Sequence, residues 1–133
     1  MIRKKRMEII APYLRDASNY SGGIAEEVLI PENPDELIEI LKTDSRPVTI
    51  AGAGTGLTAS RIPLEGIIIS LERFNKIEMH EGEEIWLGSA VTLAELQQYL
   101  QYSGWFYPPN PTEINASIGG TLATNASGSR SYK

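Results

Sequence analysis

Hydrophobic and polar positions in the first half of the chain predict one helix followed by three strands. Residues 2–15 have the apolar spacing of an amphipathic helix. Short apolar runs at 27–30, 48–51 and 67–71 predict strands, because they are rich in Val, Ile and Leu and lie beside Pro, Gly or polar residues. The run at 67–71 is apolar on both faces, which indicates a strand buried within a sheet.

A second helix is predicted between the first two strands. Asn33 can cap it, Pro34 suits its first position, and Glu36 can complete a capping box. Its apolar face is expected to consist of Leu37, Ile40 and Leu41. A strand, a helix and a strand within about 25 residues predict a βαβ crossover with parallel pairing and a right-handed connection.

The second half of the chain predicts a hairpin and one more helix. Residues 76–79 and 84–88 form the predicted hairpin, and the turn between them contains the exposed His80. Thr92 and Glu95 predict the capping box of the helix. Its buried side is expected to carry Leu93, Leu96, Tyr99 and Leu100, with Gly104 ending it.

Composition narrows the function classes. The chain has 133 residues, 41% hydrophobic and 22% charged, as expected of one small globular domain. The net charge of -5 argues against a nucleic-acid partner. Because there is no cysteine and only one histidine, thiol chemistry and metal sites built on several imidazoles are excluded. The carboxylates are scattered, so we assign no catalytic and no metal-binding residue.

The basic N-terminus does not predict a signal sequence. Arg3, Lys4, Lys5 and Arg6 are followed by an apolar stretch that ends at Pro12, too short and too charged for a secretory core or a spanning helix. We interpret this start as a solvated helix face and expect a cytoplasmic protein. The alternative is peripheral contact with the anionic inner face of the membrane, for which these basic residues are a weak anchor.

A glycine-rich loop follows the second predicted strand. Gly52, Gly54 and Gly56 occupy alternate positions, where the absence of side chains lets a ligand approach the backbone. Bare amides of this kind form a nest for anions, above all phosphates. The loop therefore predicts a ligand that carries phosphate, and a tight turn without ligand is the alternative.

Two common phosphate loops do not fit this sequence. A dinucleotide-binding Rossmann loop would have its third glycine at Leu57, and Pro63 with the next strand leaves little room for the helix that should follow. A nucleotide triphosphate loop needs a lysine after the last glycine, but none lies between Lys42 and Lys76.

A second motif covers residues 107–128. Prolines stiffen its entry, and Ser117 predicts the cap of a short helix at Ile118, whose free amides would point at an anion or a polar ring. Small residues would keep its surface flat for a planar group, namely Gly119, Gly120, Ala123, Ala126 and Gly128. Hydroxyl and amide partners would come from Thr112, Thr121, Thr124 and Asn125. A disordered tail is the alternative.

Together, the two motifs resemble the FAD-binding domain of FAD-linked oxidases of the vanillyl-alcohol oxidase type. The branch they resemble most contains the flavin subunit of glycolate oxidase and the D-lactate dehydrogenases. The residues that carry the resemblance are 16–20, 52–57, 69–77 and 109–133. It implies an α+β fold, the small βαβ-containing first half of a two-part FAD-binding domain, with a mixed sheet and flanking helices.

The resemblance implies the cofactor and the residues that would hold it. FAD would bind non-covalently, because covalently flavinylated relatives carry a histidine in this loop and this chain has none. Its pyrophosphate would lie at Ala51, Gly52, Ala53, Gly54, Thr55, Gly56, Leu57 and Thr58. Its flavin and ribityl chain would run along Pro109, Thr112, Ser117, Ile118, Gly119, Gly120, Thr124, Asn125, Gly128 and Ser129. Backbone amides there would bond the flavin edge and stabilise the reduced ring.

One departure from the family pattern concerns the far side of the loop. Thr58, Ala59 and Ser60 stand where relatives often have further glycine, which puts the tightness of that side in question.

The resemblance also implies that residues 1–133 are the first part of an FAD-binding domain, truncated before its second subdomain and substrate cap. Two functions stay open. One is the FAD-binding portion of an oxidoreductase acting on a 2-hydroxy acid such as glycolate or D-lactate, with the flavin reductase of cell-wall synthesis ranked lower. The other is a non-catalytic fragment that folds or associates without retaining flavin.

For the chain alone we expect weak FAD binding and no turnover. The expected partners are FAD and the missing C-terminal part of the enzyme or another subunit. We also expect apolar surface at Ile67–Leu71 or at the last motif to be uncovered and to drive self-association.

Overall fold

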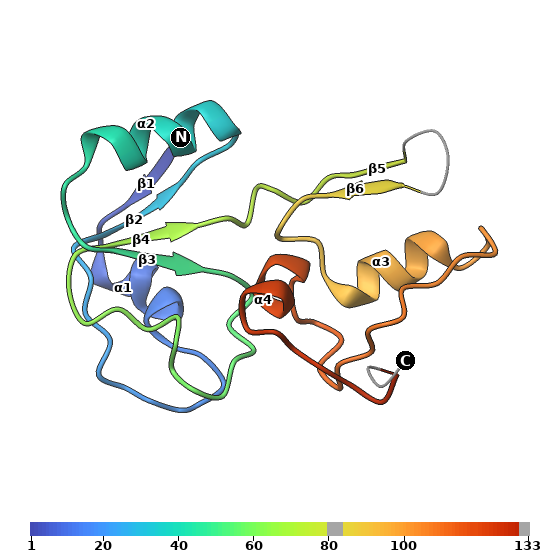
Figure 1. Ribbon diagram of the computed structural model, residues 1–133. Coiled ribbons are helices and arrows are strands. Elements are labelled where there is room, and N and C mark those ends of the chain that lie inside the picture. Colours follow the sequence, from blue (N-terminus) through green and yellow to red (C-terminus); the bar gives the residue numbers. More distant parts are fainter. Residues whose placement is uncertain (80–83, 131–133) are drawn as a thin grey trace. The chain divides into compact units, whose positions relative to one another are not determined.

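The structure is a computed structural model that describes residues 1–79 and 84–130. The chain divides into two compact units, Met1–Arg73 and Phe74–Lys133, and each unit is described by itself (Figure 1).

The first unit is built on a four-stranded mixed sheet. Its strands are β1 (Ile2–Lys4), β2 (Glu27–Ile30), β3 (Val48–Ala51) and β4 (Ile67–Ser70), in the order β1-β2-β4-β3. Strand β1 is antiparallel to β2, whereas β2 and β3 both pair parallel to β4. The three expected strands are confirmed, but β2 and β3 are not neighbours, because β4 lies between them.

The central position of β4 corrects one expectation. Ile67, Ile68 and Ile69 are completely buried, so this strand supplies no uncovered apolar surface. The physical reason is that the strand pairs on both edges and is packed on both faces. Successive residues of a strand point to opposite faces, so Ile68 belongs to one core cluster and its two isoleucine neighbours to the other.

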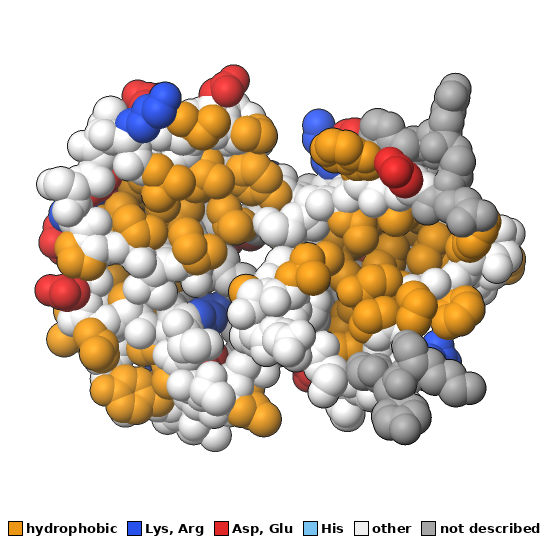
Figure 2. All heavy atoms as spheres, in the orientation of Figure 1, with side chains coloured by type: hydrophobic (Ala, Val, Ile, Leu, Met, Phe, Trp, Pro, Cys, Tyr) orange, Lys and Arg blue, Asp and Glu red, His pale blue; other side chains and the backbone are white. Residues whose placement is uncertain are grey.

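Helices pack on both faces of this sheet. On one face, Ile10 of α1 (Met7–Ile10) and Leu14 of the 3₁₀ helix η1 (Ala11–Leu14) pack against the strands. On the other face, Ile40 of α2 (Pro34–Thr43) packs against β2 and β4. Hydrophobic side chains also lie on the surface over the sheet and α2 (Figure 2); exposed ones here are Ile38, Leu41, Val48 and Ile50. In the described part of the chain, no helix is long and apolar enough to cross a membrane.

The single helix expected over residues 2–15 is wrong. Residues 2–4 form β1, which pairs with β2 in the register Ile2 to Ile30, and only the residues after them are helical. The helical part changes from α1 to the 3₁₀ helix at Ala11, next to Pro12. Proline has no amide hydrogen and disrupts an α-helix interior, which accounts for this change.

The expected start of α2 is confirmed, with one difference. The Asn33 side chain accepts a hydrogen bond from the Glu36 amide at 2.9 Å. The Glu36 carboxylate returns to the amide of Glu32, at 2.9 Å, and not to the amide of the cap residue. It also binds the N-terminal ammonium of Met1 at 2.6 Å. Leu41 is 55% exposed, so the apolar face of this helix is narrower than expected.

The second unit contains a hairpin and two helices. Strands β5 (Ile77–Met79) and β6 (Ile85–Leu87) are antiparallel, as expected, and α3 (Leu93–Leu100) and α4 (Ile118–Ala123) follow. The turn 80–83, and with it the expectation for His80, lies outside the described residues. The capping box of α3 is confirmed: the Glu95 amide donates to Thr92 Oγ1 at 3.2 Å, and the Thr92 amide donates to the Glu95 carboxylate at 2.8 Å.

The core of the second unit lies between α3, the hairpin and α4. It consists of Val91, Leu93, Leu96, Leu100, Ala116 and Ile118. Tyr99 is 45% exposed, so the expectation that it is buried is wrong. The helix ends at Leu100, with Gln101 as its C-cap, and Gly104 adopts a positive φ of 79° only after the turns that follow.

Candidate functional site

Arg61 holds the glycine loop at the end of β3. Its Nη1 donates to the carbonyl oxygen of Gly52 at 2.7 Å, and its Nη2 donates to the carbonyl oxygen of Pro12 at 2.9 Å. Gly54 has a φ of +78°, and a Cβ atom there would lie 2.5 Å from Nη1 of Arg61. Its conformation therefore favours glycine at position 54, and any side chain there would displace the guanidinium of Arg61.

A turn at residues 16–20 lies against the same loop. The amide of Ala17 donates to the carbonyl oxygen of Gly54 at 3.1 Å. Asp16 Oδ1 accepts hydrogen bonds from the hydroxyl and the amide of Ser18, and these bonds, with the charge of Arg61, lower the pKa of Asp16. Burial lowers the pKa of Arg61, an effect that the charge of Asp16 opposes.

Two polar atoms beside the loop are buried without a partner in the described part of the chain. They are Oδ2 of Asp16 and Nε of Arg61. A Cβ atom on Gly56 would lie 4.0 Å from Oδ2 of Asp16, so this carboxylate lies next to the loop. A carboxylate and a guanidinium of opposite charge therefore lie beside the loop.

The amides of the loop itself are free. Among the described residues, no hydrogen bond is donated by the amides of Ala53 to Thr58. Ala51 is buried at the end of β3, whereas Leu57 is 76% exposed. A loop that presents unpaired amides beside glycines offers the donors that an anion needs.

The start of α4 differs from what we expected. The amides of its first residues are all used within the unit: Ile118 donates to Val91 at 2.8 Å, Gly119 to Ser89 at 2.9 Å and Gly120 to Ser117 Oγ at 3.3 Å. The predicted cap at Ser117 is confirmed, but the expectation of free amides is wrong. The physical reason is that the chain before α4 runs antiparallel to residues 89–94, through a bridge between Thr92 and Ser117.

Within the second unit, the structure brings together the two ends of the predicted flavin wall. Asn110, which follows Pro109, donates to Ser129 Oγ at 3.3 Å. A Cβ atom on Gly128 would overlap the carbonyl group of Asn110, so these two stretches of backbone are in close contact. Thr112 is exposed at the same entry.

The hydroxyl groups expected to face the ligand are partly engaged. Thr124 Oγ1 donates to the carbonyl oxygen of Gly120 at 2.9 Å, and the buried Thr121 donates to that of Ile118 at 2.8 Å. Asn125 is exposed and adopts a φ of +49°. The accessible polar side chains of this segment are therefore fewer than its sequence suggests.

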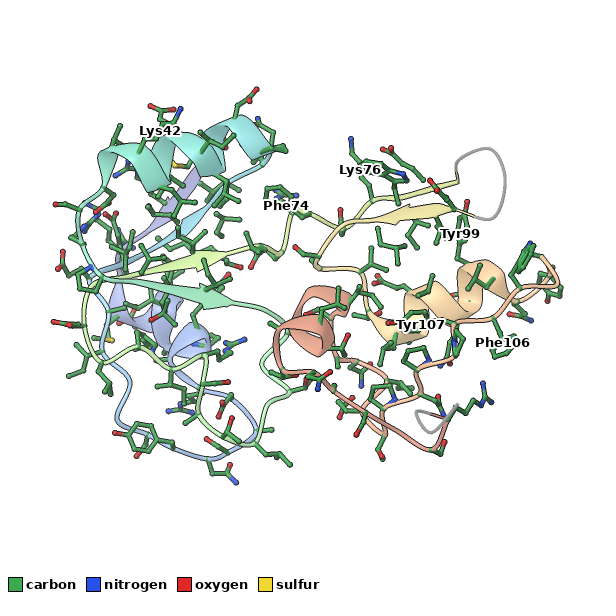
Figure 3. The ribbon with its side chains drawn as sticks, in the orientation of Figure 1. Lys42, Phe74, Lys76, Tyr99, Phe106 and Tyr107 are labelled. Atoms are coloured by element: carbon green, nitrogen blue, oxygen red, sulfur yellow. The ribbon has the colours of Figure 1, made fainter. Side chains whose placement is uncertain are left out.

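The second unit also contains an apolar hollow of about 440 Å³. Its walls come from β6, α3, α4 and the chain after α3, where Figure 3 shows Phe106 and Tyr107. Leu122 is 71% and Phe106 66% exposed. Hydrophobic side chains gather on this face of the unit (Figure 2), so the expected uncovered apolar surface is present at the last motif.

Sequence reasoning missed the groups that support the glycine loop. Arg61 and Ala17 contact the loop directly, and Asp16 lies beside it. A signal was present, because the sequence Asp-Ala-Ser-Asn at 16–19 is typical of a tight turn, in which the Asp side chain bonds the backbone two residues on. What the sequence did not indicate was that this turn packs against the loop.

Comparison with known proteins finds a matching family model and several similar proteins. A family model described as FAD binding domain matches residues 25–133. A D-lactate dehydrogenase from Archaeoglobus fulgidus is 37% identical over 111 residues, which are 80% of this chain and 25% of that protein. A D-lactate dehydrogenase from Anaerostipes hadrus is 34% identical over 133 residues, covering 95% of this chain and 28% of the relative.

A solved structure shares the fold. The structure of alkyldihydroxyacetonephosphate synthase aligns with 95% of this chain and 29% of its own, with a TM-score of 0.81 at 17% identity. The expected α+β fold with a mixed sheet and flanking helices is thereby confirmed. The chain spans about a quarter of the length of these two D-lactate dehydrogenases.

Proposed function

This chain belongs to the FAD binding domain family, and we propose that its glycine loop binds the pyrophosphate of non-covalently held FAD. The observation that carries the proposal is that the amides of Ala53 to Thr58 have no acceptor among the described residues, in a loop whose Gly52 and Gly54 carbonyl groups already accept hydrogen bonds. Those donors suit phosphate oxygens, which need several hydrogen bonds at once.

The loop would bind phosphate through its backbone. The guanidinium of Arg61 donates to two backbone carbonyls, so the charge of this group lies behind the loop. The nearby carboxylate of Asp16 balances that charge. We therefore expect the affinity to depend mainly on amide geometry and only weakly on ionic strength.

The second unit would supply the wall along the flavin and ribityl chain. The first amides of α4 are already bonded, so Ser117, Ile118, Gly119 and Gly120 would contribute packing surface. Polar contacts would come from residues that are exposed or half-buried, namely Pro109 through its carbonyl group and Thr112, Asn125 and Ser129 through their side chains. Thr124, whose hydroxyl already donates to the Gly120 carbonyl, and Gly128 would contribute packing surface. When bound, the flavin supplies the acceptor for a hydride equivalent.

We further propose that the substrate of the complete enzyme is a 2-hydroxy acid of the D-lactate or glycolate type. The support is the similarity to two D-lactate dehydrogenases, of which this chain covers about a quarter. The scattered carboxylates of this chain offer no paired acid and base, so the catalytic groups would come from a second FAD subdomain and a substrate cap. Residues 1–133 would then be the cofactor-binding first part of that enzyme, without turnover by themselves.

A second candidate function is that of a non-catalytic protein that associates through its apolar surface without retaining flavin. The uncovered apolar hollow beside Phe106 and Leu122 favours it, because exposed apolar patches promote association. The two candidates differ in whether the chain binds FAD.

Titration of the chain with FAD, ADP and riboflavin tests the proposal. FAD fluorescence should change on binding, ADP should compete with FAD, and riboflavin, which lacks the pyrophosphate, should bind far more weakly. No binding of FAD at millimolar concentration would favour the second candidate, and riboflavin binding as tightly as FAD would contradict the role of the loop. D-lactate with a dye as electron acceptor should give no turnover.

A further inference from the structure

Residues 11–20 contact the glycine loop although they lie outside the region matched by the family model. The match begins at residue 25. Upstream of it, the Ala17 amide donates to the Gly54 carbonyl and the Pro12 carbonyl accepts from Arg61, which also bonds the Gly52 carbonyl. Two carbonyl groups of the loop are thus tied, one directly and one through Arg61, to the N-terminal segment.

The turn that presents the Ala17 amide is fixed by its own hydrogen bonds. Asp16 Oδ1 accepts from the Ser18 amide at 2.9 Å, and the Ser18 hydroxyl accepts from the Tyr20 amide at 3.2 Å. Asn19 has a φ of +62°, which asparagine tolerates better than most residues. The hydrogen bonds of the turn therefore hold the Ala17 amide in place independently of its contact with the loop.

Arg61 connects two segments that are far apart in the sequence. Its guanidinium is a rigid planar fork, so two donors with fixed geometry hold the Gly52 and Pro12 carbonyls at 2.7 Å and 2.9 Å. It also fills the space where any side chain at position 54 would lie. A lysine could place one ammonium group there but would lack the fork.

We propose that residues 11–20, together with Arg61, are a structural part of the FAD loop and position its free amides for the ligand. The identity of the ligand rests on the proposed function, whereas the ordering of the loop by residues 11–20 and Arg61 does not. Glycine-rich backbone loses much conformational freedom when it is ordered, so a loop ordered before binding binds its ligand more tightly. The ligand-binding unit therefore includes residues 11–20, which precede the stretch that the family model matches.

Two variants of the full chain test the positioning role, one in the turn at residues 16–20 and one at Arg61. Ala17→Pro removes the donated amide hydrogen at the second position of the turn, where proline is favoured. Arg61→Met removes both guanidinium hydrogen bonds while keeping an unbranched stem. The matched controls are Ala17→Ser, which keeps the amide, and Arg73→Met, which removes an exposed arginine outside the loop.

The first measurement is the backbone ¹⁵N order parameter of residues 53–58 without ligand. We expect rigid values of about 0.85 in the natural chain and in both controls, and values below about 0.6 in Ala17→Pro and Arg61→Met. The order parameters of β2 and β4 should not change. Unchanged order parameters in both loop variants would overturn the inference.

The second measurement is a titration with ADP followed by amide chemical shifts. Both loop variants should lose roughly tenfold or more in ADP affinity, as expected when loop-ordering hydrogen bonds are removed. If ADP fails to bind the natural chain, the proposed function fails while the order parameters still decide the inference. If Arg61→Met does not fold, Arg61→Lys replaces it, with the same loss of loop order expected.

Discussion

The guanidinium of Arg61 occupies the place that a side chain on Gly54 would need. A Cβ atom at position 54 would lie 2.5 Å from Nη1 and 2.8 Å from Cζ of Arg61, and the φ of Gly54 is +78°. The conformation of the loop and the position of its supporting arginine are therefore linked through one glycine.

Gly54→Ala should destabilise the first unit and disturb the loop. Strain at positive φ costs about 1 kcal/mol for alanine, and displacement of Arg61 should add about 1–2 kcal/mol, because its hydrogen bonds to Gly52 and Pro12 would be distorted. The free energy of unfolding in urea measures the sum. Gly104→Ala is the matched control, because Gly104 has a φ of +79° and the added Cβ would meet no atom of the described residues within 4 Å. Equal losses in the two variants would contradict the contact with Arg61.

Thr92→Ala should destabilise the second unit by about 1 kcal/mol, since it removes one half of a capping box. Thr92→Ser keeps the hydroxyl and should retain most of the stability. Thermal unfolding followed by the near-UV signal of Trp105 and Trp86 reports on this unit. A loss in the serine variant as large as that in the alanine variant would show that the Thr92 methyl group matters more than the cap.

Local sequence signals predicted the elements of both units well. Asn33 and Thr92 cap their helices as expected, because a cap is a contact over three residues and needs no distant partner. The N-terminal segment was predicted wrongly, since Ile2 pairs with Ile30 on a strand far along the chain. Apolar spacing alone does not indicate such pairing.

Stability should fall between about pH 4 and pH 2 because of Asp44. Hydrogen bonds from the Arg46 side chain and amide lower the pKa of Asp44 from 3.8 to about 2. A carboxylate with a lowered pKa stabilises the fold above its unfolded pKa and loses that contribution as pH falls through the folded value. Urea unfolding at several pH values measures the slope.

The matched variant is Asp44→Asn. It should be less stable than the natural chain at pH 5 and should show a shallower fall in stability between pH 4 and pH 2. Arg46 keeps its ion pairs with Glu26 and Glu27 in this variant, so the arginine is not left unpaired. Parallel pH profiles for the two chains would contradict the assignment to Asp44.

Leu122→Asp should weaken the binding of an apolar dye to the second unit. Leu122 lines the apolar hollow and is 71% exposed, so a carboxylate there should disfavour apolar ligands at little cost in stability. Dye fluorescence and light scattering at increasing protein concentration measure the effect. Leu64→Asp, at a 68% exposed position of the first unit, is the control and should leave dye binding unchanged.

The candidate site was predictable in its parts but not in its hydrogen bonding. Three alternating glycines indicated exposed amides, and within the part of the chain that the structure describes no acceptor pairs with the amides of Ala53 to Thr58. The same reasoning failed at α4, where Val91 and Ser89 accept the amides that looked free. Which amides are free depends on the segment that packs beside them, and a motif does not contain that information.

Mapping of amide chemical shifts on titration with FAD tests the central claim most directly. We predict that the amides of Ala53 to Thr58 shift with both FAD and ADP, whereas residues 109–129 shift with FAD and not with ADP. Loop amides that stay unchanged while FAD binds elsewhere, or the absence of any shift at saturating FAD, would contradict the account.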